Sequence, residues 1–161
     1  MPAADTLAQR YAQVRATTLA LAAALSAEDC QVQSMPDASP VKWHLAHVTW
    51  FFETFVLERF EPRFLPFDAS FRVLFNSYYQ AVGEQSARAQ RGLILRPGLD
   101  VVRAYRAQVD ARMTALIESR GAEPEVAELI TLGLHHEQQH QELLLTDIKH
   151  ALSFDPSHAP Y

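Results

Sequence analysis

The chain has 161 residues, 48% of them hydrophobic and 20% charged, which is the composition of a folded globular domain and not of a disordered chain. Its 14 Lys and Arg against 19 Asp and Glu give a formal net charge of −5, which argues against a binding surface for nucleic acid or an anionic membrane. Cys30 is the single cysteine, which excludes an intramolecular disulfide and a tetracysteine zinc site. Since the sequence has no apolar run of membrane-spanning length and no signal peptide, it predicts a cytoplasmic protein.

Three segments in the first half of the chain have a helical character. The first carries a core-facing seam at intervals of three and four residues, formed by Leu7, Tyr11, Val14, Thr18, Leu21 and Leu25. The second, residues 40–60, is dense in aromatic side chains, and we expect Ser39 to be its N-cap and Pro40 its first helical residue. The third is a shorter helix over residues 70–82 that ends at Gly83.

Two longer helices are predicted in the second half of the chain, after a connecting loop over residues 83–98. One spans about residues 100–120, with Gly121 as its C-terminal stop, and the other runs from Pro124 to about Leu152. No segment shows the alternation that is typical of a strand. The sequence therefore predicts an all-α bundle of four long helices and one short helix.

Four of the seven histidines fall in two short motifs, WHLAH (residues 43–47) and HEQQH (residues 136–140). His136 and His140 are four residues apart, so their imidazoles stand one turn apart on the same side of the last helix. Two adjacent buried imidazoles cannot both be protonated cheaply, whereas a divalent metal binds neutral imidazole and replaces the lost hydration. We therefore interpret the pair as metal ligands. The alternative is two core histidines that bond to carbonyl groups or water.

A third ligand is expected from the second helix. His47 lines up with two phenylalanines that follow it at intervals of four residues, which is an inward-facing position. His44 lies three residues earlier and competes for the same role, so the spacing favours His47 without excluding His44. His135 is rotated by about 100° from His136 around the helix and is expected at the surface.

HEQQH also matches the HExxH motif of zinc proteases, in which the glutamate activates water. Such sites sit beside a sheet edge that holds the peptide, and this sequence has no strand signal. We therefore interpret Glu137 as a surface carboxylate or as one that supports a metal ligand. Three neutral imidazoles would leave the ion open coordination positions, about three for octahedral Fe(II) and one for tetrahedral Zn²⁺, and the residues alone do not choose between them.

Four segments together resemble one known family: residues 37–53 (DASPVKWHLAHVTWFFE), 75–83 (FNSYYQAVG), 88–93 (RAQRGL) and 135–150 (HHEQQHQELLLTDIKH). They are similar to the N-terminal DinB-like domain of the ergothioneine-biosynthesis sulfoxide synthases, which are EgtB-type hercynine oxygenases. The resemblance implies a DinB-like four-helix bundle that holds non-haem Fe(II), or Zn, Ni or Mn as substitute metals. It assigns the three ligands to His47, His136 and His140, and so selects His47 over His44.

The resemblance also implies an activity. The family's enzymes use O₂ to couple the thiol of γ-glutamylcysteine or cysteine to the imidazole ring of hercynine, and the product is a sulfoxide. Arg88 and Arg91 match the pair that binds the carboxylates of the thiol substrate, a task suited to guanidinium groups. Gln139 matches a glutamine near the bound imidazole, and Glu142 is expected to form a hydrogen bond that supports a metal ligand. The motifs identify no catalytic acid or base.

Members of that family continue into a second domain, similar to formylglycine-generating enzymes, which supplies a catalytic tyrosine and much of both substrate pockets. We expect residues 1–154 to form the bundle and residues 155–161 to be a tail or the start of the linker to that C-terminal domain. The chain would then be an excised domain or a natural stand-alone relative, not fully active alone, with an exposed site that a homodimer could close. Two alternatives stay open. One is a stand-alone DinB-like enzyme such as a zinc- or nickel-dependent thiol transferase, and the other is a metal-free helical interaction domain.

Overall fold

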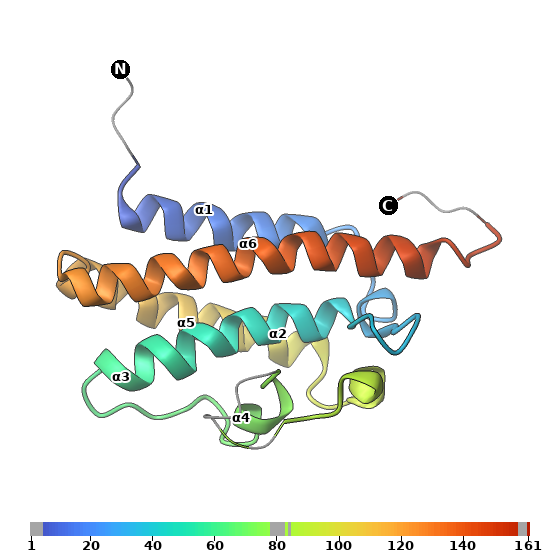
Figure 1. The fold of residues 1–161 in the computed structure, drawn as a ribbon, viewed down its shortest axis with the longest axis horizontal. Coiled ribbons are helices and arrows are strands. Elements are labelled where there is room, and N and C mark those ends of the chain that lie inside the picture. Colours follow the sequence, from blue (N-terminus) through green and yellow to red (C-terminus); the bar gives the residue numbers. More distant parts are fainter. Residues whose placement is uncertain (1–4, 78–82, 84, 158–160) are drawn as a thin grey trace.

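The computed structural model describes residues 5–77, 83, 85–157 and 161, and every regular element among them is helical (Figure 1). The α-helices are α1 (Leu7–Ala22), α2 (Val41–Phe51), α3 (Glu58–Phe60), α4 (Phe71–Leu74), α5 (Leu99–Arg120) and α6 (Pro124–Leu152). The other helical segments are η1 (Asp29–Gln31), η2 (Phe52–Leu57) and η4 (Arg88–Leu93). The all-α prediction is confirmed. Within the described part of the chain, no helix has both the length and the apolar character that crossing a membrane requires.

The bundle is built from α1, α5, α6 and a composite helix in which α2, η2 and α3 join end to end (Figure 1). This composite helix runs from Val41 to Phe60 and corresponds to the helix expected over residues 40–60. The longest helix, α6, packs against both α1 and α2, and α2 also packs against α5. The side chains that fill the space between them are large and almost fully buried, among them Trp50, Phe52, Leu45, Tyr105, Met113, Ile130, Leu134 and Leu144.

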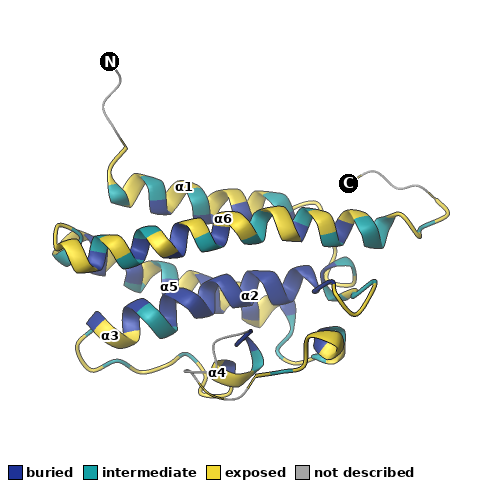
Figure 2. Cartoon of the chain, in the orientation of Figure 1, coloured by how far each residue is buried: buried dark blue, intermediate teal, exposed yellow. Residues whose placement is uncertain are grey.

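Helix α2 is buried on all sides, because every residue from Val41 to Phe51 is buried (Figure 2). Two faces of α2 pack against α5 and α6. Another is covered by the segment that contains α4 and η4, which lies beneath α2 in the view of Figure 1. Aromatic and polar side chains of α2 are therefore enclosed together, and this placement explains why the helix carries both WHLAH and a dense aromatic run.

Helices α6 and η2 approach each other closely at Gly133. A Cβ atom on Gly133 would stand 2.5 Å from Cε1 of Phe52 and 3.0 Å from Cε1 of Phe51. Only a residue without a side chain fits there, which is why a glycine interrupts the apolar stripe of α6. On the partner side, η2 is a π-helical segment, an arrangement often found at functional sites.

An ionic group lies in the core where α1, α5 and α6 meet. The carboxylate of Glu137 accepts hydrogen bonds from Nη1 of Arg15 at 2.9 Å, from Nη2 of Arg106 at 3.1 Å and from Oγ1 of Thr18 at 2.6 Å. Nε of Arg15 also donates to Asp110 at 2.6 Å. Burial opposes the ionisation of Glu137, but the two guanidinium groups outweigh it and hold the pKa of this carboxyl below its ordinary value. The prediction that Glu137 is a surface carboxylate is therefore wrong.

Three further expectations need correction. Ser39 is not the N-cap of α2, because Pro40 occupies that position, and the Ser39 hydroxyl accepts a hydrogen bond from Arg91 instead. The helix expected over residues 70–82 ends at Leu74, and residues 78–82 lie outside the described part. At that end the Leu74 carbonyl accepts hydrogen bonds from Nε1 of Trp43 and from Oγ of Ser86. The loop expected over residues 83–98 contains the helical segment η4.

Candidate metal centre

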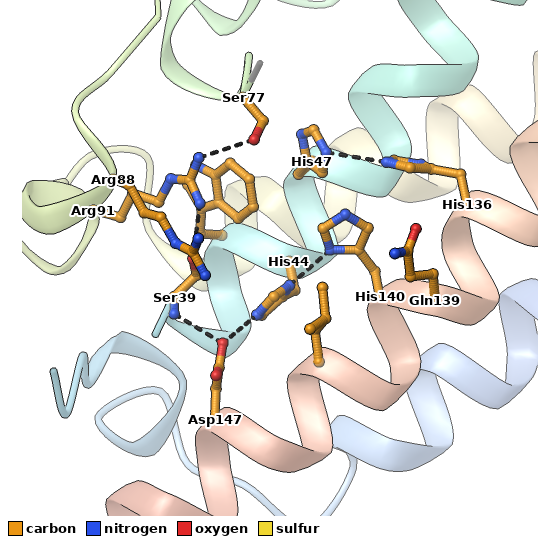
Figure 3. Close-up of a pocket in the computed structure, with 12 residues that line it drawn as sticks. Ser39, His44, His47, Ser77, Arg88, Arg91, His136, Gln139, His140 and Asp147 are labelled. Atoms are coloured by element: carbon orange, nitrogen blue, oxygen red, sulfur yellow. Dashed lines mark hydrogen bonds and ion pairs between the residues drawn. The ribbon is translucent and has the colours of Figure 1, made fainter. Parts of the chain in front are cut away.

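Three imidazoles from two helices meet in the bundle: His47 from α2, and His136 and His140 from α6 (Figure 3). One nitrogen atom of each ring lies within 4.8 Å of those of the other two. The ring centroids are 5.0 Å apart for His47 and His136, 4.7 Å for His47 and His140, and 4.6 Å for His136 and His140. About 90 positions separate His47 from His136 and His140 in the sequence. The fold brings all three within reach of a single ion.

The orientation of His47 is set by the end of α4. Its Nδ1 lies 2.6 Å from the carbonyl oxygen of Phe75, which only accepts hydrogen bonds, so Nδ1 carries the proton and the lone pair is on Nε2. That Nε2 atom lies 3.2 Å from Nε2 of His136. Trp43 and Trp50 stack on the two faces of the His47 ring, with centroid distances of 4.4 and 5.4 Å. The carbonyl and the indoles together leave the His47 ring little freedom to turn.

The three imidazoles are neutral at pH 7. Burial lowers the pKa of His136 to about 4. For His47 and His140, burial and the neighbouring histidines lower the pKa well below its ordinary value. Neutral imidazole nitrogen is the form that coordinates a transition metal, and a cation placed among them would replace the lost contact with water. The donor set therefore fits a divalent metal such as zinc, nickel or iron, and it does not identify which.

His44, the competitor for the role of third ligand, lies next to the cluster and contacts it from outside. Its Nδ1 is 3.0 Å from Nδ1 of His140, and its Nε2 is 2.9 Å from Oδ2 of Asp147. Both ring nitrogens of His44 are therefore engaged by other groups. The geometry selects His47 as the third member of the cluster.

A cavity of about 480 Å³ opens beside the three imidazoles. Its walls carry side chains from α2, α6, η4 and the segments that precede them: Ser39, Trp43, His44, His47, Ser77, Arg88, Arg91, His136, Gln139, His140, Leu143 and Asp147. Arg88, Arg91 and Gln139, which the sequence assigns to substrate binding, thus share one cavity with the histidines (Figure 3). Sharing a cavity does not test whether these residues bind substrate, and that role stays a prediction.

The two arginines occupy different settings in this cavity. Arg91 is buried, and its guanidinium lies 3.5 Å from the centre of the Trp43 ring while donating to Ser39 and Ser77 at 2.9 and 3.2 Å. Arg88 is exposed at the rim and donates to the backbone carbonyl of Asp37. Arg91 is therefore held inside the wall of the cavity, and Arg88 lies at its exposed rim.

Two carboxylates near HEQQH lie away from the cavity. Glu142 is exposed and is not among the residues that line the cavity, so its supporting hydrogen bond stays a prediction. Glu137 points into the ionic group of the core, on another side of α6 from His136, and it cannot activate water at the imidazoles as the glutamate of a zinc protease does. His135 is exposed, as the helical period predicts.

Sequence reasoning missed Asp147, Ser39, Ser77 and Trp43 as members of the site. Asp147 was detectable in principle, because it falls seven residues after His140 and interrupts an apolar stripe with a charge. Ser77 and Ser39 become neighbours only because the chain folds back over α2. Their contribution depends on tertiary contacts, which no local pattern records.

Comparison with models of known protein families matches residues 10–144 to the model of the DinB superfamily. The matched range begins within α1 and ends within α6, so it includes all three histidines. A search among curated proteins found no significant match.

Proposed function

The chain belongs to the DinB superfamily, and on this premise we propose that it is the metal-binding part of a metal-dependent enzyme. The observation that supports this most directly is the set of three neutral imidazoles, that of His47 buried and those of His136 and His140 partly buried, whose nitrogens lie within 4.8 Å of one another. His47, His136 and His140 would bind the ion through their inward-facing nitrogens. A divalent ion held by three imidazoles supplies Lewis acidity and open coordination positions for substrates.

We further propose that the ion is Fe(II) and that the reaction is the O₂-dependent joining of a thiol to the imidazole ring of hercynine. The motifs shared with the ergothioneine-biosynthesis sulfoxide synthases support this finer assignment. The cavity supports it as well, since it sets guanidinium groups beside the imidazoles. Arg91 and Arg88 would orient the carboxylates of γ-glutamylcysteine or cysteine, and Gln139 would contact the imidazole substrate. A C-terminal domain similar to formylglycine-generating enzymes would complete the pockets.

Metal analysis of the purified chain and its variants tests the proposal. We expect about one divalent metal ion per chain after reconstitution, measured by elemental mass spectrometry. His47→Ala, His136→Ala and His140→Ala are each expected to lower the content at least tenfold, because two imidazoles form a much weaker site. His135→Ala is the matched control, since His135 is exposed on the same helix next to His136 and should leave the metal content unchanged.

Metal content that is the same in all four variants would contradict the proposed centre. The finer assignment has its own readout: O₂ uptake and a sulfoxide product from γ-glutamylcysteine and hercynine, with a formylglycine-enzyme-like domain added in trans. Turnover of a thiol without O₂ uptake would favour the thiol transferase instead. In either case Arg91→Met should raise KM for a thiol that carries carboxylates more than for one that lacks them.

A further inference from the structure

A line of hydrogen bonds leads from the histidine cluster towards the arginines (Figure 3). Nδ1 of His140 lies 3.0 Å from Nδ1 of His44, and Nε2 of His44 lies 2.9 Å from Oδ2 of Asp147. The same carboxylate oxygen accepts from the backbone amide of Ser39 at 2.9 Å. Through its hydroxyl, Ser39 continues the line to Arg91.

The chemistry of Asp147 gives this line a direction. A carboxylate only accepts hydrogen bonds, so Nε2 of His44 must donate to it. In a neutral imidazole the other nitrogen is then an acceptor, which makes Nδ1 of His44 the acceptor for Nδ1–H of His140. The lone pair of His140 is therefore left on Nε2.

The two side chains at the centre of this line, His44 and Asp147, are largely buried. The side chain of His44 is 3% exposed and that of Asp147 is 12% exposed. In such surroundings a hydrogen bond is stronger than in water, and a missing one is costly. The tautomer of His140 is thus set by His44, which belongs to α2 and is bonded to Asp147 of α6.

We propose that His44 and Asp147 are positioning residues that fix His140 as a ligand through Nε2. This inference rests on the proposed function and assigns a part to two residues that the motif resemblance leaves without one. The other two imidazoles differ in this respect. His47 is held by the Phe75 carbonyl, whereas Nδ1 of His136 is buried and has no hydrogen-bond partner in the described part of the chain.

The tautomer of His140 is measurable in the metal-free chain by long-range ¹H–¹⁵N correlation NMR. We expect His140 to carry its proton on Nδ1 in the unchanged chain. In His44→Phe, which keeps a ring but offers no acceptor, we expect the Nε2–H form to appear. An unchanged chain with His140 protonated on Nε2 would overturn the inference, and this result is obtained even if the variant fails to fold.

Metal affinity provides the second readout, from chelator competition with Co(II) or Zn²⁺. His44→Phe and Asp147→Leu are expected to weaken binding about 10–100-fold, the usual effect of losing a group that orients a ligand. Asp147→Asn keeps an acceptor oxygen and should lose less. His150→Phe is the matched control, because His150 also lies on α6 and contacts a distant segment through Ser34 at 2.7 Å, but it lies outside the line described above.

The results separate the inference from the proposed function. An Nδ1–H tautomer in a chain that binds no metal would overturn the proposed function and leave the positioning of His140 intact. A chain that binds metal equally well in its unchanged form and in His44→Phe, with equal thermal stability, would overturn the inference and leave the metal centre intact. Equal weakening in His150→Phe would show a general loss of stability and would also overturn it.

Discussion

His44 and His47 lie one turn apart on the same helix, yet their imidazoles have different hydrogen-bond partners. His47 faces His136, whereas His44 lies behind His140 and bonds to Asp147. Both side chains are almost fully buried, so burial alone does not distinguish them. The difference comes from what each ring nitrogen meets: a backbone carbonyl at the end of α4 for His47, and a carboxylate on α6 for His44.

The neutral histidines make the metal-free chain sensitive to acid. His136 has its pKa lowered by burial to about 4, while in the unfolded chain a histidine titrates near 6.5. Between these values the unfolded chain binds more protons, so the free energy of unfolding should fall as pH decreases from 6.5 towards 4. Each such group contributes a slope of about 1.4 kcal/mol per pH unit. Urea unfolding of the metal-free chain at pH 7.5, 6.0 and 5.0 measures it.

His136→Gln is the control for this prediction, because glutamine does not titrate. We expect the variant to show a shallower dependence than the unchanged chain over the same range. The carboxylates are the same in both chains, so their titration cancels in the comparison. Equal urea midpoints at all three pH values in the unchanged chain would contradict the assignment of neutral, desolvated imidazoles.

At the scale of elements, the sequence was most informative where the helical period is long. It predicted the bounds of α5 and α6 closely. It did not predict the π-helical segment η2, which packs against α6 and α5. It also did not predict that the carbonyls of Leu74 and Phe75, at the end of α4, accept hydrogen bonds from Trp43 and His47 of the distant helix α2.

The close approach at Gly133 gives a prediction for the α2–α6 contact. Gly133→Ala inserts a methyl group where the Phe52 ring stands, and the ring is rigid and fully buried. The cost of overpacking exceeds the gain in helix propensity, so we expect a loss of about 1–2 kcal/mol in the free energy of unfolding. Because Gly133 lies one turn before His136, metal affinity should fall as well.

Calorimetry and chelator competition measure these two effects. Glu128→Ala, on the exposed face of the same helix, serves as the control and should change neither by a significant amount. A Gly133→Ala variant of unchanged or higher stability would show that the helices can separate at this point without cost.

For the whole molecule, the sequence predicted the architecture but not what fills its centre. Apolar periodicity is enough to specify a helical bundle, and residues 10–144 match a family of that architecture. Periodicity treats Arg15 and Arg106 as surface residues, however, because arginine is rarely buried without a partner. Their burial depends on Glu137, which is distant from Arg15 in sequence and is supplied by a different helix.

The ionic group of Arg15, Arg106 and Glu137 is expected to be necessary for the stability of the bundle. Glu137→Gln removes the negative charge that Arg106 pairs with and leaves Asp110 as the ion-pair partner of Arg15, which should cost about 3–5 kcal/mol. Urea unfolding of the metal-free chain measures this. Glu142→Gln makes the same chemical change at an exposed position of α6 and should stay within about 0.5 kcal/mol of the unchanged chain. Equal effects of the two substitutions would contradict the role of the ionic group.

His136 and Glu137 are consecutive residues, and they anchor α6 in two directions about 100° apart. One faces the imidazole cluster and the other the guanidinium groups of α1 and α5. If α6 rolled about its own axis by about 20°, side chains about 5 Å from that axis would move by about 2 Å, which is more than a hydrogen bond tolerates. The rotation of α6 about its own axis is thus fixed by electrostatic contacts in the core, and this does not require a bound ion. The metal-free site should therefore keep its shape, and exchange of one ion for another should proceed without unfolding of the bundle.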